Sequence, residues 1–65
     1  MTSILKTIRN QRKLSQEEMA GDLGVTANYI SLIENGRKRP GMRFLEQVSS
    51  TYSVPLVLVA QNELI

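Results

Sequence analysis

Three residue types that carry much of enzyme chemistry are missing from this sequence, which has no cysteine, no histidine and no tryptophan. Without cysteine there are no disulfides and no thiolate ligands for zinc. Without histidine or cysteine, a serine–histidine triad, a cysteine nucleophile and a histidine-ligated zinc hydrolase are all excluded. For a chain of 65 residues with these gaps, we expect a protein that is not an enzyme and that needs no cofactor or metal ion.

Long apolar runs are missing as well. The longest run, residues 56–60, has five residues, whereas a transmembrane helix needs about 20. The first six residues do not follow the charged-then-apolar order of a signal peptide. We therefore expect one small soluble domain over residues 1–65, in a reducing compartment and most simply the cytoplasm.

Positive charge is confined to the first two thirds of the chain. All eight Lys and Arg residues precede residue 44, together with four of the six acidic residues. Residues 44–65 contain two acids and no base, so the formal net charge of +2 combines a basic part with an apolar, slightly acidic part. Such asymmetry suggests a polyanion bound on one side, although an ordinary solvated surface is the plain alternative.

The spacing of apolar residues predicts an all-α domain of five short helices. The sequence has no internal repeat, no low-complexity stretch and no linker. The predicted helices cover residues 3–13, 16–23, 27–35, about 42–52 and about 55–62. Pro55 suits the first turn of the last helix, because its missing N–H and fixed φ fit that position.

The second and third of these helices carry the signals of a helix-turn-helix. Ser15 and Glu18 form a capping box at the start. Gly24 can adopt the left-handed conformation that the turn needs, and Thr26 can cap the next helix. Ala20 supplies the small residue that two steeply crossing helices need where they come closest. The apolar positions fit the inner sides of the two helices and the corner beneath the turn, where Val25 lies. They are Met19, Leu23, Val25, Ile30 and Ile33.

Three stretches of the sequence are Leu-Ser-Gln-Glu-Glu-Met-Ala, Gly24-Val25-Thr26 and Ile30-Ser31-Leu32-Ile33-Glu34-Asn35-Gly36. They closely resemble the phage-repressor/Cro family of DNA-binding regulators, the XRE-type helix-turn-helix, and the likeness extends over about residues 6–58. The resemblance implies a compact five-helix domain, with its helix-turn-helix at residues 16–36. It also implies binding to operator DNA, usually as a dimer on a two-fold related site, and a structural ion pair between Arg9 and Glu34.

Two residues depart from the family's pattern. Gly21 lies inside the second helix, where a better helix former is expected, at a cost of about 1 kcal/mol relative to alanine. Ser53 stands where similar sequences often carry glycine after the fourth helix. Neither residue belongs to those expected to face DNA, so the departures concern stability and not function.

A recognition helix of this kind lies in the major groove, with its N-terminal residues at the base edges. Asn28 can pair with adenine through two hydrogen bonds, while Ala27 and Leu32 can pack on thymine methyl groups, so we expect an A·T-leaning site. Tyr29 either contacts a base or packs on the edge of the core with its hydroxyl on a phosphate. The expected base contacts are Ala27, Asn28, Tyr29, Ser31 and Leu32.

A second group of residues is expected to contact phosphates, through N–H groups at helix ends or through positive charge. The Gln16 amide stands at a helix N-terminus, and a basic loop follows the third helix. Such contacts set the affinity and its salt dependence without reading the base sequence. The expected residues are Gln16, Thr26, Asn35, Gly36, Arg37, Lys38, Arg39 and Arg43.

The C-terminal segment has more apolar residues than one face of a short helix needs. We expect a second copy of the chain to cover part of it, with half-sites about 34 Å apart on the DNA. Continuation of the chain past residue 65 is the alternative explanation. The expected homodimer residues are Leu56, Val57, Val59, Leu64 and Ile65, with Leu58 beside them.

The leading hypothesis is therefore a sequence-specific, double-stranded-DNA-binding transcriptional regulator, acting as a repressor or autoregulator. The second hypothesis is a protein-interaction module, such as a dimerising antirepressor, that keeps the fold without binding DNA. Gln16, Asn28 and the basic loop argue against it, because a lost function leaves no reason for that side to stay basic. Within the first class, a restriction–modification controller or an antitoxin would look the same at this length. No small-molecule or membrane partner is expected.

Overall fold

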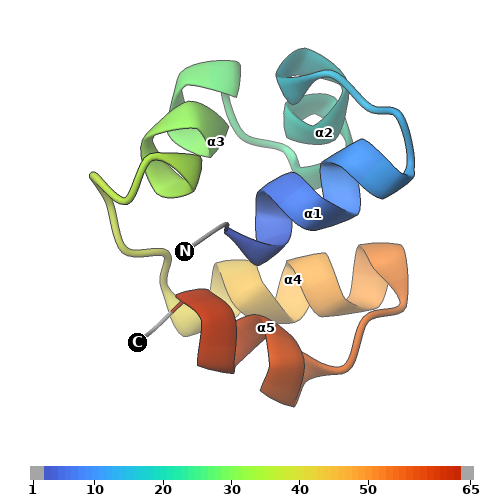
Figure 1. Ribbon diagram of the computed structural model, residues 1–65, viewed down its shortest axis with the longest axis vertical. Helices are drawn as coiled ribbons and strands as arrows, with labels where there is room; N and C mark the ends of the chain where they lie inside the picture. Colours follow the sequence, from blue (N-terminus) through green and yellow to red (C-terminus); the bar gives the residue numbers. More distant parts are fainter. Residues whose placement is uncertain (1–2, 64–65) are drawn as a thin grey trace.

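The computed structural model describes residues 3–63, and the all-α fold predicted from the sequence is confirmed (Figure 1). Five helices follow one another: α1 (Ile4–Gln11), α2 (Gln16–Leu23), α3 (Ala27–Glu34), α4 (Met42–Tyr52) and α5 (Leu56–Glu63). The described residues contain no strand. Within the same range, no helix combines the length and the apolar character needed to cross a membrane.

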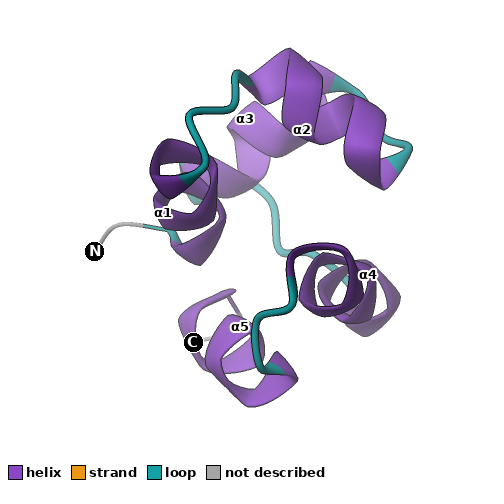
Figure 2. Cartoon of the chain, turned by 90° about the vertical axis from the view of Figure 1, so that its right-hand side faces the viewer, coloured by secondary structure: helices purple, strands orange, loops and turns teal. Residues whose placement is uncertain are grey.

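The helices form two groups with α1 between them (Figures 1 and 2). At one end of the molecule α2 packs against α3, and at the other end α4 packs against α5. Because α1 contacts both α3 and α5, it joins the two groups, and α2 also reaches α4. This arrangement holds the inner side of α3 against the rest of the protein and leaves its outer side to solvent.

Short-range interactions set the ends of α2 and α3. The Ser15 hydroxyl accepts the Glu18 N–H at 3.0 Å, and the Glu18 carboxylate accepts the Ser15 N–H at 2.9 Å, so the predicted capping box is present. Gly24 ends α2 with a φ of 71°. The Thr26 hydroxyl caps α3 by accepting the Tyr29 N–H at 3.1 Å. The turn between the two helices is therefore specified by local sequence.

The first helix is shorter than the predicted range of residues 3–13. Ser3 is its N-cap and accepts the Leu5 N–H at 3.2 Å, while Arg12 is its C-cap. Lys13 has a φ of 56°, a left-handed conformation that an α-helix does not continue. Arg12 and Lys13 are both exposed, so the apolar spacing carried no information about where the helix ends.

Helix α4 ends at Ser53, which has a left-handed conformation with a φ of 55° and occupies the position where glycine was expected.

Apolar side chains from all five helices form one core. The buried apolar residues are Leu5, Ile8, Met19, Ala20, Leu23, Ile30, Ile33, Phe44, Leu45, Val48, Tyr52 and Val59. All the inner positions predicted for α2 and α3 belong to this core except Val25, which is half-buried and packs against it.

Three polar contacts fasten α4 to the N-terminal half of the chain. The Tyr52 hydroxyl donates to the Asp22 carboxylate at 3.0 Å, and the Gln47 amide donates to the Leu23 carbonyl at 2.6 Å. The Arg12 guanidinium donates to the Tyr52 carbonyl at 2.6 Å, and it lies 5.2 Å from the centroid of the Tyr52 ring. Since these contacts join residues far apart in sequence, they fix how the two helix groups sit together.

Candidate nucleic-acid interface

Helix α3 has an anchored side and an open side. Ile30 and Ile33 are 0% and 3% exposed, and they hold the inner side against the core. On the other side Asn28 is exposed near the start of the helix. The remaining predicted base contacts on this helix are half-buried: Ala27, Tyr29, Ser31 and Leu32. The Asn28 amide is therefore the exposed group of this set, while Ala27 and Tyr29 also pack against the core.

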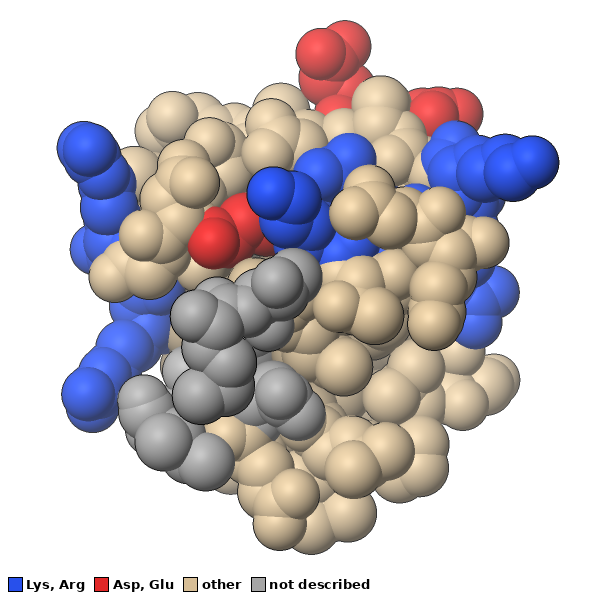
Figure 3. Space-filling model, in the orientation of Figure 1, with Lys and Arg blue, Asp and Glu red and all other residues tan. Residues whose placement is uncertain are grey.

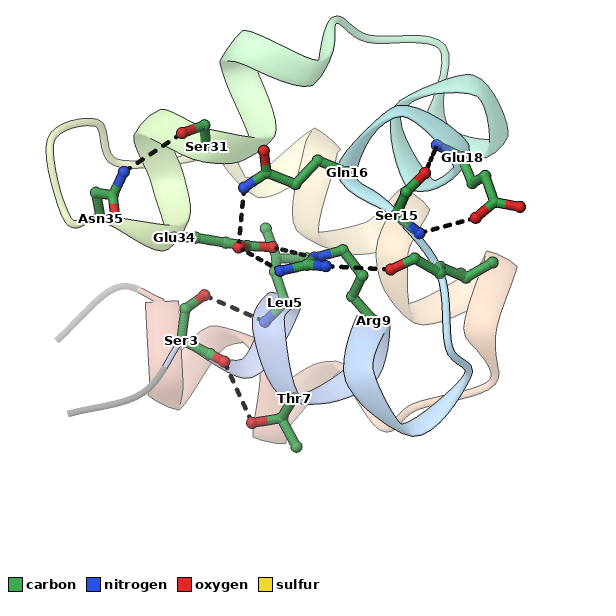
Figure 4. Close-up of polar contacts among 11 residues, drawn as sticks. Ser3, Leu5, Thr7, Arg9, Ser15, Gln16, Glu18, Ser31, Glu34 and Asn35 are labelled. Carbon is green, nitrogen blue, oxygen red and sulfur yellow. Dashed lines mark hydrogen bonds and ion pairs between the residues drawn. The ribbon is translucent and has the colours of Figure 1, made fainter.

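The C-terminal end of α3 is fixed by an ion pair to α1 (Figure 4). Arg9 donates from Nε to Glu34 Oε2 at 2.9 Å and from Nη2 to Glu34 Oε1 at 3.1 Å. Arg9 Nη1 also donates to the Leu14 carbonyl at 3.1 Å, so one guanidinium holds α1, the loop before α2 and α3. The side chains of Arg9 and Glu34 are 16% and 4% exposed. Their hydrogen bond raises the pKa of Arg9, which therefore stays charged.

The same carboxylate also receives the side chain of Gln16, the first residue of α2. Gln16 Nε2 donates to Glu34 Oε1 at 3.3 Å, as Figure 4 shows. Gln16 is half-buried at a helix N-terminus, where backbone N–H groups and the helix dipole favour an anion. Because one amide hydrogen points to Glu34, the second is left to donate elsewhere. Glu34 thus orients the first residue of α2 as well as the last turn of α3.

The Tyr29 ring is packed rather than extended into solvent. Its centroid lies 5.1 Å from that of Phe44, with the two ring planes at 88°, an edge-to-face arrangement. The Lys38 ammonium lies 5.5 Å from the centroid of the Tyr29 ring. Of the two roles predicted for Tyr29, this geometry corresponds to packing at the edge of the core.

A basic loop follows α3, and its charged side chains are all exposed. Arg37, Lys38 and Arg39 are followed by the buried Pro40, which ties the loop to the body of the protein, and Arg43 is exposed in the first turn of α4. Around this loop, Figure 3 shows Lys and Arg side chains along the edge of the molecule, whereas residues 56–61 of α5 include no charged residue. The charge asymmetry of the sequence is therefore also an asymmetry of the surface.

The expectation that the Asn35 and Gly36 amides bind phosphates is wrong for their backbone groups. The Asn35 N–H donates to the Ser31 carbonyl and the Gly36 N–H donates to the Ile33 carbonyl, each at 3.0 Å. Asn35 Nδ2 also donates to the Ser31 hydroxyl at 3.3 Å (Figure 4). A helix C-terminus leaves carbonyls unpaired and not N–H groups, so these amides close the helix end instead.

The predicted dimer residues do not share one surface. Val59 is 0% exposed and belongs to the core, so its assignment to an interface is wrong, and Leu56 is half-buried against the same core. Val57 and Leu58 are exposed, at 61% and 45%. The run of apolar residues has no helical period, so its inner face could not be identified from the sequence. Two further predicted residues, Leu64 and Ile65, lie outside the described residues.

Sequence reasoning missed the residues that hold α4 against α1 and α2. The sequence analysis assigns no role to Arg12, Asp22 and Gln47, whose contacts reach partners 24 to 40 positions away. One signal was available, because a buried tyrosine hydroxyl normally finds a hydrogen-bond partner. Tyr52 falls at an apolar position of the helix predicted over about residues 42–52, so a partner for its hydroxyl on a neighbouring helix was to be expected.

Comparison with known proteins agrees with this geometry. The chain is 32% identical over 62 residues to the ImmF control region 10 kDa protein of Bacillus phage phi105, and it covers 69% of that protein. It is 33% identical over 63 residues to the cryptic phage CTXphi transcriptional repressor RstR of Vibrio cholerae, of which it covers 57%. It is 34% identical over 59 residues to the uncharacterized HTH-type transcriptional regulator YqaE of Bacillus subtilis, of which it covers 51%.

The matched segments cover 95%, 95% and 91% of this chain, so the likeness extends over nearly all of it, but over only about half of the two longer relatives. The names of these relatives describe control proteins and transcriptional regulators and not enzymes. No solved structure gives a significant match. A family model described as helix-turn-helix matches residues 5–59. The chain therefore belongs to the helix-turn-helix family, and the resemblance drawn from its motifs is confirmed.

Proposed function

We propose that this domain is a sequence-specific, double-stranded-DNA-binding transcriptional regulator, and that it represses transcription from a two-fold related operator. The observation that carries the proposal is the presentation of α3, whose inner side is anchored in the core while Asn28 and the basic loop stand exposed at its two ends. The names of the related regulators support the same class of function.

In this proposal α3 lies in the major groove, with its N-terminal residues at the base edges. Asn28 Nδ2 donates to N7 of an adenine and Asn28 Oδ1 accepts from its N6–H, a pairing that discriminates by about 1–3 kcal/mol. Ala27 and Leu32 pack on thymine methyl groups, and the Ser31 hydroxyl lies on the same helix. These residues favour an A·T-leaning half-site.

Phosphate contacts surround the groove contact on both sides. The exposed cations at the C-terminal end of α3 neutralise phosphates without reading bases. At the N-terminal ends of α2 and α3, the second amide hydrogen of Gln16 and the Thr26 hydroxyl donate to the backbone of the same duplex. The proposed phosphate contacts are Gln16, Thr26, Arg37, Lys38, Arg39 and Arg43.

We propose further that the exposed side of α5 pairs two copies of the chain. Val57 and Leu58 expose apolar surface at the start of this helix, at 61% and 45%. A two-fold pairing places two recognition helices about 34 Å apart, one turn of B-DNA. A Val57→Asp variant is then expected to sediment as a monomer and to bind a single half-site more weakly than the wild type binds the full operator.

The proposal is tested by selection of binding sites from a random duplex pool, followed by titrations over a series of salt concentrations. We expect an A·T-leaning inverted repeat with half-sites one helical turn apart, and an affinity that falls steeply with salt. Lys6→Met removes a positive charge from the exposed side of α1 and serves as the control, with an unchanged selected site. In cells, the selected site placed in a promoter is expected to lower expression of a reporter.

Two results would count against the proposal. A pool without enrichment would exclude sequence-specific recognition, and a flat plot of log affinity against log salt would exclude the phosphate contacts. A chain that dimerises but shifts no DNA in a gel would instead favour the protein-interaction module as the function.

A further inference from the structure

Lys38, in the basic loop after α3, lies over the ring of Tyr29, a contact that an exposed lysine does not need for its own solvation. The Lys38 ammonium lies 5.5 Å from the centroid of the Tyr29 ring, within the range of a cation–π interaction. Tyr29 itself packs edge-to-face against Phe44 of α4, at a centroid distance of 5.1 Å. Lys38 is therefore positioned by a ring that is in turn held by the core.

The other cations of the loop have no comparable support. Arg37 and Arg39 are exposed, and their side chains make no ion pair, hydrogen bond or ring contact to the described residues. An exposed lysine has a flexible four-carbon stem, and ordering it on a phosphate costs side-chain entropy. Holding the ammonium over a ring removes part of that cost before any ligand arrives.

The ammonium of Lys38 keeps its donors while it lies over the ring. It forms no hydrogen bond with the residues that the structure describes, so its three N–H groups remain open to an acceptor on the solvent side. A phosphate oxygen can accept from the ammonium while the ring stays beneath it, because a cation–π contact uses charge and not a hydrogen bond. Ring and phosphate are therefore compatible partners of the same group.

We infer that Tyr29 is a positioning residue, which presents Lys38 to a DNA phosphate beside the C-terminal end of α3 and does not read a base. This inference rests on the proposed function and assigns different roles to two neighbouring residues of α3. Asn28 selects the sequence, whereas its neighbour Tyr29 acts through Lys38 on the affinity for every sequence. The Phe44 contact gives the ring a fixed place from which to do so.

The test is a double-mutant cycle on DNA affinity, measured on the selected site and on site variants. Lys38→Met is expected to weaken binding to all of them by about the same factor and to lower the salt slope by about 0.9. In a Tyr29→Leu background the further loss on Lys38→Met is expected to shrink by about two- to fivefold, the value of an exposed cation–π contact. In a Tyr29→Phe background, which keeps the ring and removes the hydroxyl, the loss is expected to stay near its wild-type value.

A readout without DNA separates this contact from the fold and from the proposed function. In the free protein, the Lys38 ε-methylene protons are expected to resonate upfield through the ring current of Tyr29, and to return to ordinary values in Tyr29→Leu. Thermal unfolding of each variant shows whether it is folded at the assay temperature, and Lys6→Met again controls for loss of charge alone.

Two outcomes would overturn the inference while DNA binding by the wild type stands. One is an equal loss on Lys38→Met with and without the ring. The other is a Tyr29→Leu variant whose preference changes at one base pair, which would make Tyr29 a base contact. A wild-type protein that binds no DNA would overturn the proposed function itself, and with it the role of Tyr29, even if the upfield lysine signals were present.

Discussion

Arg9 and Glu34 form the only ion pair among the described residues. Two hydrogen bonds join their side chains, although the residues are 25 positions apart in the sequence. The pair joins α1 to the last turn of α3, and the same carboxylate accepts from Gln16 at the start of α2. Three helices are thus oriented by one buried acid. This arrangement sets the angle at which α3 is presented, because the opposite end of that helix is held by the Thr26 cap.

Removing Arg9 is expected to destabilise the fold strongly. In Arg9→Met the Glu34 carboxylate, 4% exposed, loses both of its charged donors, and an uncompensated buried charge costs about 3–5 kcal/mol. Urea denaturation would show the loss as a lower midpoint with a similar slope. The double variant Arg9→Met/Glu34→Leu is expected to recover part of it, since it leaves no charge unpaired. A single variant as stable as the exposed-site control Arg37→Met would contradict this role.

Gly21→Ala is expected to stabilise the protein by about 1 kcal/mol. Gly21 lies inside α2, and a Cβ built there meets no atom within 4 Å, so only the helix propensity changes. Gly24→Ala is the matched control, because its Cβ also meets nothing while its φ of 71° is unfavourable for alanine. Thermal unfolding should move in opposite directions for the two variants, and a parallel change would refute the assignment.

Stability is expected to fall at alkaline pH through Tyr52. Burial, followed by the hydrogen bond to Asp22, raises the pKa of Tyr52 to about 12 from its ordinary value of 10.0. The folded state therefore keeps the phenol proton that the unfolded state releases. This contribution is complete below pH 10 and is lost as the pH rises from 10 towards 12, by at most about 1.4 kcal/mol per pH unit.

The measurement is the free energy of unfolding between pH 9 and pH 11.5, compared between wild type and Tyr52→Phe. The variant lacks the phenol, so its curve should be flatter in that window, although its stability at pH 7 is lower by the lost hydrogen bond, about 1 kcal/mol. The rest of the sequence is the same in both proteins, so its contribution cancels in the comparison. Parallel curves would show that the phenol does not titrate differently on folding.

Asn28→Ala and Arg39→Ala are expected to weaken DNA binding in different ways. The first removes an exposed amide from the groove side of α3, and should cost about 1–3 kcal/mol on the best site and relax the preference at one base pair. The second removes a charge outside the groove, and should weaken all sequences alike while lowering the salt slope by about 0.9. Titrations against the selected site and its single-base variants separate the two patterns. An unchanged preference in Asn28→Ala would remove that residue from base recognition.

The ends of α2 and α3 could be read from the sequence because their causes are local. The capping box at Ser15, the left-handed Gly24 and the Thr26 cap each act over three or four residues, so no packing information is needed to place them. The same holds for the buried sides of the two helices, which follow the 3.6-residue period. This local information was also sufficient to identify the helix-turn-helix family.

The tertiary structure determined the features that depend on contacts between residues distant in sequence. In α5, Val57, Leu58 and Val59 are chemically alike, and only packing against α1 and α4 determines that Val59 turns inward. Gln16 was expected to contact a phosphate, and Tyr29 either a base or the edge of the core. The packing of the helices brings Gln16 to Glu34 and Tyr29 to Phe44. The sequence alone determines the helix caps, the hydrophobic period and the distribution of charge, because these are properties of neighbouring residues. Which partner a side chain finds depends on the packing of the helices, because it brings together residues that are distant in sequence.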